Sequence, residues 1–196
     1  MKHVMYLGGL VCPSAVLVWA PAAVAGDVTC TGGPTSPLTG RIVGNVVVPA
    51  GASCRIQGTV TGNVTALEGA QVGIRPGSIV HGNYTCDRCL FADLHGSTIH
   101  GNVVIVGETD GSFIDDSTIK GNLEIDSSDA DGDAFAIGTA DLPNKIGGNL
   151  SFTNNTGTSS IVNNAVSGYL TCQNNAPAPA SAGNTAKKGI LGQCAA

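Results

Sequence analysis

Hydrophobic and polar positions alternate in a phrase that recurs along the chain: a β-branched residue, a mixed position, Gly, Asn, and then Val, Tyr or Leu. Alternation with a period of two predicts short strands with one face buried and the other in solvent. The glycines of the phrase are spaced by 18, 20, 19, 20, 27 and 20 residues, and this regularity predicts a solenoid. They are Gly44, Gly62, Gly82, Gly101, Gly121, Gly148 and, in a degenerate copy, Gly168.

A unit of roughly 20 residues is too short for a pair of helices but suits one coil of a parallel β-helix, in which three short strands are joined by bends. Glycine tolerates the positive φ that such a bend can require. The Asn that follows is expected to stack on the Asn of the next coil, about 4.8 Å away, and to pass amide hydrogen bonds along a ladder. The predicted ladder residues are Asn45, Asn63, Asn83, Asn102, Asn122 and Asn149.

We therefore predict an all-β, single-domain parallel β-helix of about seven coils of roughly 20 residues, stabilised by disulfides. The composition agrees, because aromatic residues make up only 4% and no window has an apolar period of 3.6 residues. The repeats are expected over 41–172, with an insertion at 126–143 that bulges from one edge. An N-terminal cap is predicted over 26–40 and a C-terminal, disulfide-tethered cap over 173–196.

Residues 1–25 have the pattern of a cleaved signal peptide. A basic start at Lys2 is followed by an apolar stretch without a carboxylate, and Ala23-Val24-Ala25 fits the small residues before a cleavage site. We therefore expect a secreted, extracellular protein that begins at Gly26, is free or associated with the cell envelope, and does not insert into a membrane.

Six cysteines remain after the predicted leader, as expected for disulfides in an oxidising compartment. Six cysteines allow 15 connectivities, and position in the repeat favours pairs that brace the start, middle and end of the coil. The spacing of Cys86 and Cys89 also occurs in redox pairs, but a β-repeat favours a structural bond. The favoured pairs are Cys30–Cys54, Cys86–Cys89 and Cys172–Cys194, and the other connectivities stay open at this point.

Two groups of residues are candidates for a metal. Alternating carboxylates in the insertion suit calcium, but their spacing around Gly132 departs from the usual loop, which favours a solvated acidic loop. His81 and His100 occupy the same position in successive coils, so their imidazoles should lie about 5 Å apart, although an ordinary solvated face is favoured there too. No cofactor is expected apart from this calcium candidate, whose carboxylates are Asp126, Asp129, Asp131 and Asp133.

The net charge of −5 argues against a nucleic-acid partner. The nearest approach to a catalytic cluster is formed by the carboxylates Asp115, Asp116, Glu124 and Asp126. Lys120 is their only basic neighbour, so no catalytic residue is assigned. We expect a non-enzymatic structural or adhesive protein that contacts a cell-surface or extracellular polymer. The alternatives are a polysaccharide lyase or glycoside hydrolase, and a calcium-dependent adhesin. Self-association through the open edges of the terminal coils also stays open.

Gly-Ala-Ser-Cys at 51–54, the repeated Ile/Val-x-Gly-Asn-Val and Gly-Gln-Cys at 192–194 resemble the small secreted β-helix proteins of actinobacteria. This resemblance covers nearly all of the predicted mature chain and implies the fold and export, but no catalytic residue. The valine-rich coils also resemble bactofilins, which are cytoplasmic polymers without such a leader or such cysteines, so polymerisation is not implied.

Overall fold

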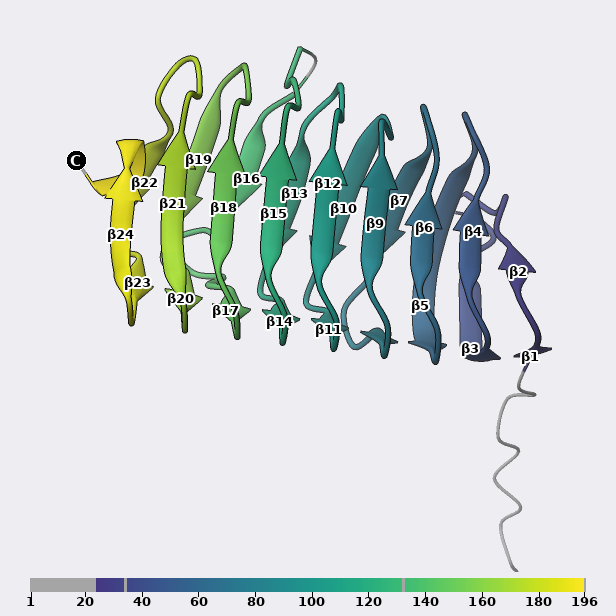
Figure 1. Ribbon diagram of the computed structural model, residues 1–196. Coiled ribbons are helices and arrows are strands. Elements are labelled where there is room, and N and C mark those ends of the chain that lie inside the picture. Colours follow the sequence, from purple (N-terminus) through teal and green to yellow (C-terminus); the bar gives the residue numbers. More distant parts are fainter. Residues whose placement is uncertain (1–23, 34, 132, 196) are drawn as a thin grey trace, which may run out of the picture.

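The computed structural model describes residues 24–195 except 34 and 132, and these residues form an all-β parallel solenoid of about eight turns (Figure 1). The predicted fold class is therefore confirmed. The predicted leader lies outside the described residues except for β1 (Val24–Ala25), which pairs in parallel with β3 (Leu38–Val43). The described residues contain no helix that is long and apolar enough to cross a membrane.

Each coil contributes strands to three faces. The first face contains β7 (Gln71–Ile74), β10 (Phe91–His95), β13 (Ser112–Asp115), β16 (Phe135–Ile137), β19 (Ser159–Val162) and β22 (Ala180–Ala182). The short-strand face contains β8 (Ile79–Val80), β11 (Thr98–Ile99), β14 (Thr118–Ile119), β17 (Lys145–Ile146), β20 (Ala165–Val166) and β23 (Thr185–Ala186). The strand β5 (Ser53–Val60) runs through the bend and joins these two faces into one sheet.

The third face is a separate nine-stranded sheet, whose strands lie side by side in Figure 1. It contains β2 (Val28–Thr29), β4 (Val46–Val48), β6 (Val64–Ala66), β9 (Tyr84–Asp87), β12 (Val103–Val106), β15 (Leu123–Asp126), β18 (Leu150–Thr153), β21 (Tyr169–Gln173) and β24 (Gly189–Gly192). The last described residues form a short 3-10 helix, η1 (Gln193–Ala195).

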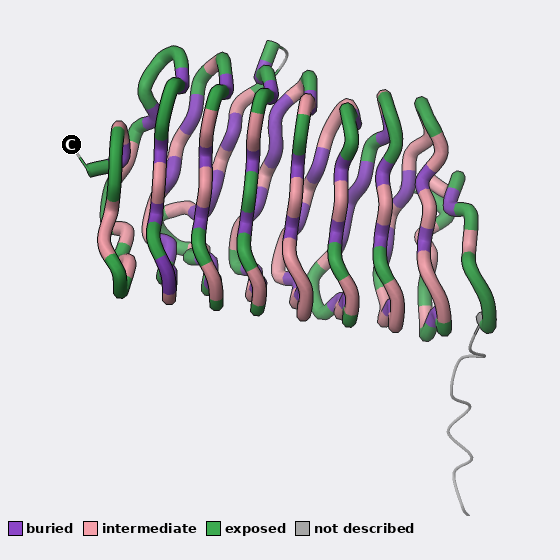
Figure 2. Tube along the Cα trace, in the orientation of Figure 1, coloured by how far each residue is buried: buried purple, intermediate pink, exposed green. Residues whose placement is uncertain are grey.

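Buried and accessible positions alternate along the strands, as Figure 2 shows. The parallel register places like residues over like, for example Ile105 of β12 beside Ile125 of β15. Burying one such aliphatic side chain contributes about 1.5–3 kcal/mol, so the stacked rows stabilise the solenoid with few aromatics. Phe135 and Phe152, the largest rings inside with Tyr84, pack edge to face at 5.3 Å between centroids.

The predicted asparagine ladder is present. Oδ1 of Asn83 accepts the backbone N–H of Asn102 at 2.8 Å, and the same bond recurs between successive ladder asparagines. Asp27 begins the ladder by accepting two hydrogen bonds from Asn45, and Asn149 ends it by accepting the N–H of Tyr169. The ladder therefore links side chain to backbone at every step, and Asn63 adds an amide-to-amide bond to Asn45 at 3.2 Å.

The glycine before each ladder asparagine is required for a different reason than the positive φ that was predicted. Only the first, Gly44, has a positive φ, of 145°. At Gly101 a Cβ would lie 2.3 Å from Oδ1 of Asn83, and the five other later copies meet the Oδ1 of the preceding coil's asparagine in the same way. Glycine is therefore needed because the ladder amide occupies the space that a Cβ would fill.

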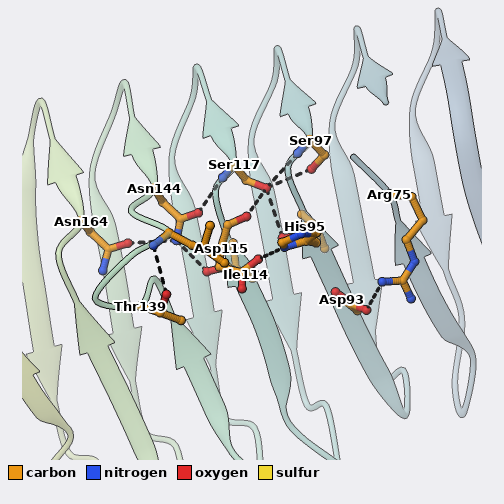
Figure 3. Close-up of polar contacts among 12 residues, drawn as sticks. Arg75, Asp93, His95, Ser97, Ile114, Asp115, Ser117, Thr139, Asn144 and Asn164 are labelled. Atoms are coloured by element: carbon orange, nitrogen blue, oxygen red, sulfur yellow. Dashed lines mark hydrogen bonds and ion pairs between the residues drawn. The ribbon is translucent and has the colours of Figure 1, made fainter. Parts of the chain in front are cut away.

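Two further polar ladders lie inside the other two corners, and the sequence pattern did not predict them. In one, Oδ1 of Asn155 accepts the N–H of Ser128, and Asn175 does the same for Asn155. In the other, Ser117 donates its N–H to Asn144, whose Nδ2 donates to Asn164 (Figure 3). These buried side chains accept hydrogen bonds from backbone N–H groups at the turns between strands, where no strand pairing is available to them.

Three disulfides match the favoured pairing. They join Cys30 to Cys54 near the start of the stack, Cys86 to Cys89 in the middle and Cys172 to Cys194 at the end.

Three predicted boundaries change. The insertion at 126–143 is not one bulge, because β16 keeps its place between β13 and β19 and divides the extra residues into two loops. The segment 173–196 is not a separate cap but adds a last coil, whose strands pair with β19, β20 and β21. Part of 26–40 also joins the solenoid, since β2 pairs with β4. This accounts for about eight turns in place of about seven.

Candidate functional site

A hollow of about 440 Å³ opens on the short-strand face across β14, β17, β20 and β23. Its shape follows from the register. Lys120, Gly147, Ser167 and Lys187 each follow one of these strands and succeed one another along the stack. The two small residues leave a gap between the two lysines. Lys145 borders the gap from the neighbouring row, where it lies between Thr118 and Ala165.

The charge of this hollow is positive. Three of the four lysines in the described part of the chain line it, and its lining residues include no carboxylate. None of the three lysines forms an ion pair with a described residue. The fourth, Lys188, lies with Nζ 5.8 Å from the ring centroid of Tyr169. Because the whole chain has a net charge of −5, this cationic surface is a local feature.

The histidine pair extends the same row away from the hollow. His81 and His100 pack edge to face with ring centroids 4.6 Å apart, close to the predicted spacing, and Lys120 follows in the next coil. Partial burial, and then the charges of Lys120 and His81, lower the pKa of His100. Its imidazole is therefore more often neutral near pH 7 than an isolated histidine would be.

The first face carries the Arg75–Asp93 ion pair and the His95–Asp115 contact drawn in Figure 3. Nη1 of Arg75 lies 2.6 Å from a carboxylate oxygen of Asp93, and Nδ1 of His95 contacts the carboxylate of Asp115. Asp115 was grouped by sequence with Glu124, but the structure separates them, because Glu124 projects from the third face on β15. The carboxylates 115, 116, 124 and 126 therefore do not converge on one groove.

The acidic loop does not gather the four predicted calcium ligands. Although partial burial pushes the pKa of Asp126 upward, hydrogen bonds from Thr153, Asn154 and Ser127 hold it below its usual value. The other three carboxylates, Asp129, Asp131 and Asp133, are exposed. Among the described residues, which omit Gly132 of this loop, no group of three or more His, Cys, Asp or Glu side chains is placed to hold a metal. Calcium binding stays a prediction.

Sequence reasoning singled out Lys120 as the basic neighbour of a group of carboxylates, and it missed the hollow. Lys145 lies near the end of the 27-residue interval between Gly121 and Gly148, and Lys187 lies beyond the last copy of the Gly-Asn phrase. Ile146 is the β-branched residue two positions before Gly148, and Lys145 directly precedes it. Aligning the coils on this β-branched position would have placed Lys145 beside Thr118.

Comparison with known proteins adds no relative: no family model, no curated protein and no solved structure matches this chain. The resemblance to actinobacterial β-helix proteins stays a prediction, and the site must be judged on its own chemistry.

Proposed function

We propose that this protein is a non-catalytic extracellular adhesion module that binds a linear anionic polymer along its short-strand face. The observation that carries the proposal is the hollow lined by Lys120, Lys145 and Lys187, with no carboxylate among its lining residues. The ammonium groups of these lysines form no ion pair with a described residue, so an anion can bind them without breaking an existing ion pair.

The spacing of the lysines suits a polymer rather than a single small anion. Lys120 and Lys187 are separated by three coil steps, which at about 4.8 Å each place their backbones roughly 14 Å apart. Lys145 lies between them, so a chain parallel to the solenoid axis meets a cation at each end and in the middle. Lysine is a compact charge on a flexible stem, which tolerates the variable geometry of a repeating ligand.

The hollow also supplies hydrogen-bonding groups for a polymer. Thr118, Ser167 and Thr185 bring hydroxyls to the same surface, and the floor between them consists of small residues such as Gly147 and Ala165. Each exposed cation contributes only about 0.2–1 kcal/mol to an ion pair. Useful affinity therefore requires several repeats to bind together, as a polyanion allows.

Binding rather than cleavage is proposed because glycosidic hydrolysis generally uses a pair of carboxyl groups, and the hollow has none. The extracellular setting is supported by the three disulfides, which persist in oxidising compartments, and by the predicted leader.

Isothermal titration with polygalacturonate tests the proposal, with dextran as an uncharged control. The triple variant Lys120→Gln, Lys145→Gln, Lys187→Gln should weaken binding by about 30- to 100-fold, if each cation contributes about 0.7–0.9 kcal/mol.

A control removes two exposed cations outside this face, in Arg88→Gln, Lys188→Gln, and should bind within a few-fold of the wild type. A loss per removed charge as large as that of the triple variant would mean that overall charge, not this hollow, controls binding. Release of reducing sugar from the polymer would replace the adhesion proposal with the enzyme alternative.

A further inference from the structure

A second and smaller hollow, of about 160 Å³, lies on the first face where β5, β7 and β10 run side by side. Its floor is open because Gly73 occupies the middle of the row between Arg55 and Asp93. We call it the arginine hollow, because Arg55 and Arg75 both line it. It lies on a different face from the lysine-lined hollow and does not depend on the function proposed above.

The side chain of Arg75 lies across Gly73. A Cβ built on Gly73 would come within 2.9 Å of one terminal nitrogen of Arg75, so the guanidinium occupies space that exists only because the residue is glycine. The neighbouring carboxylate of Asp93 holds this group through Nη1 (Figure 3). The side chains are only 28% and 18% exposed, so the guanidinium is held in place at the border of the hollow.

Both arginines keep a buried donor without an acceptor. Nε of Arg55 and Nε of Arg75 are inaccessible to solvent, and neither finds a hydrogen-bond partner among the described residues. Arg55 also forms no ion pair with any described residue. A buried donor without a partner is unfavourable, so a small movement of the guanidinium toward a bound acceptor is favoured.

The rest of the lining combines one amide with one aromatic ring. Oε1 of Gln71 accepts a hydrogen bond from Ser53 at 3.4 Å, and its amide nitrogen donates to no described residue. Phe91 borders the hollow and packs edge to face against Phe113, with centroids 5.5 Å apart. Because Phe113 supports it, the ring of Phe91 forms a firm apolar wall next to the guanidinium groups.

We propose that the arginine hollow binds a single carboxylate attached to a saturated ring, the chemical class that includes uronic acids. The planar fork of a guanidinium matches a carboxylate, and the ring can pack its C–H face on Phe91. Arg55, Arg75 and Asp93 together have a net charge of +1, so one monoanion neutralises the hollow. Its volume holds one such residue, not a stretch of polymer.

Titration of the ¹⁵N-labelled protein with sodium glucuronate, followed by NMR, tests this proposal. Saturable shifts are expected at the arginine Nε–H groups and along β7 and β10, with a dissociation constant of about a millimolar. Glucose, which lacks the carboxylate, should cause at most a tenth of these shifts at the same concentration. Inorganic phosphate, which lacks the ring, should bind several-fold more weakly than glucuronate.

Arg55→Gln should weaken glucuronate binding about tenfold, whereas Arg88→Gln, an exposed change of the same charge, should leave it unchanged. Gly73→Ala provides a second variant, because its methyl group displaces the guanidinium of Arg75 without removing a charge, and it should also weaken binding. Melting curves confirm that each variant is folded. Equal shifts with glucose, equal binding of phosphate, or undiminished binding in the folded Arg55→Gln variant would each overturn the proposal.

Discussion

Glu108 is a buried carboxyl group whose protonation should control the pH dependence of stability. It follows β12 at a corner of the solenoid and is fully buried. Its N–H donates to Ser128, so it occupies a position that Ser128, Asn155 and Asn175 occupy in later coils. Unlike those residues it can ionise, and one of its carboxyl oxygens, Oε1, has no described hydrogen-bond partner.

Burial raises the pKa of Glu108 from its ordinary value of 4.5 to about 8, against the opposing effects of hydrogen bonds from Ser112 and the Ala92 backbone. Between these two pH values the folded protein keeps a proton that the unfolded chain releases, so the free energy of unfolding falls as pH rises and levels off above about 8. At about 1.4 kcal/mol per pH unit, this interval amounts to about 4–5 kcal/mol.

Guanidinium chloride unfolding with the disulfides intact, followed by circular dichroism at about pH 5 and about pH 8.5, measures this loss. Glu108→Gln keeps the shape of the side chain but cannot ionise, so its unfolding free energy should lack the loss, which between these two pH values is about 4 kcal/mol. Glu124→Gln, an exposed change on the next strand of the third face, is the matched control and should follow the wild type. An equal pH dependence in Glu108→Gln and the wild type would refute the reasoning.

Three other outcomes follow from the contacts described above. Gly101→Ala should lower the free energy of unfolding by more than about 2 kcal/mol, because its methyl group meets the ladder amide of Asn83, and a chemical melt measures this. Replacing the disulfide of Cys172 and Cys194 by two serines should cost about 3 kcal/mol in the same assay, from the 22-residue separation of the two cysteines. EDTA should leave the melting temperature unchanged, and a clear fall on chelation would instead support the calcium-dependent adhesin.

The sequence was sufficient to predict the solenoid because its coils carry the same phrase at nearly constant spacing. Residues such as Asn83 and Asn102 recur at a fixed place, so the ladder between them could be predicted without coordinates. The buried corner ladder was not predicted, because residue type changes along it. Ser117 gives way to Asn144 and Asn164, and only the stacking reveals that these residues share a column.

Both proposed sites exist because small residues interrupt a row of larger side chains along the stack. A repeat pattern in the sequence does not reveal such gaps. The arginine hollow exists because Gly73 interrupts a row of outward side chains. The lysine-lined hollow exists because Gly147 and Ser167 succeed Lys120, beyond an insertion that disturbs the spacing. In each case the sequence shows which side chains are present, but the space between them depends on which residues of successive coils stack on one another.

Zero-length cross-linking is the most direct test that an anionic polymer lies along the short-strand face. A carbodiimide joins the carboxylates of bound polygalacturonate only to lysines that touch them, and mass spectrometry of the digested protein identifies these lysines. The proposal predicts links at Lys120, Lys145 and Lys187, with Lys188 as an internal control that stays largely unmodified. Links concentrated at Lys188, or spread equally over all four lysines, would contradict it.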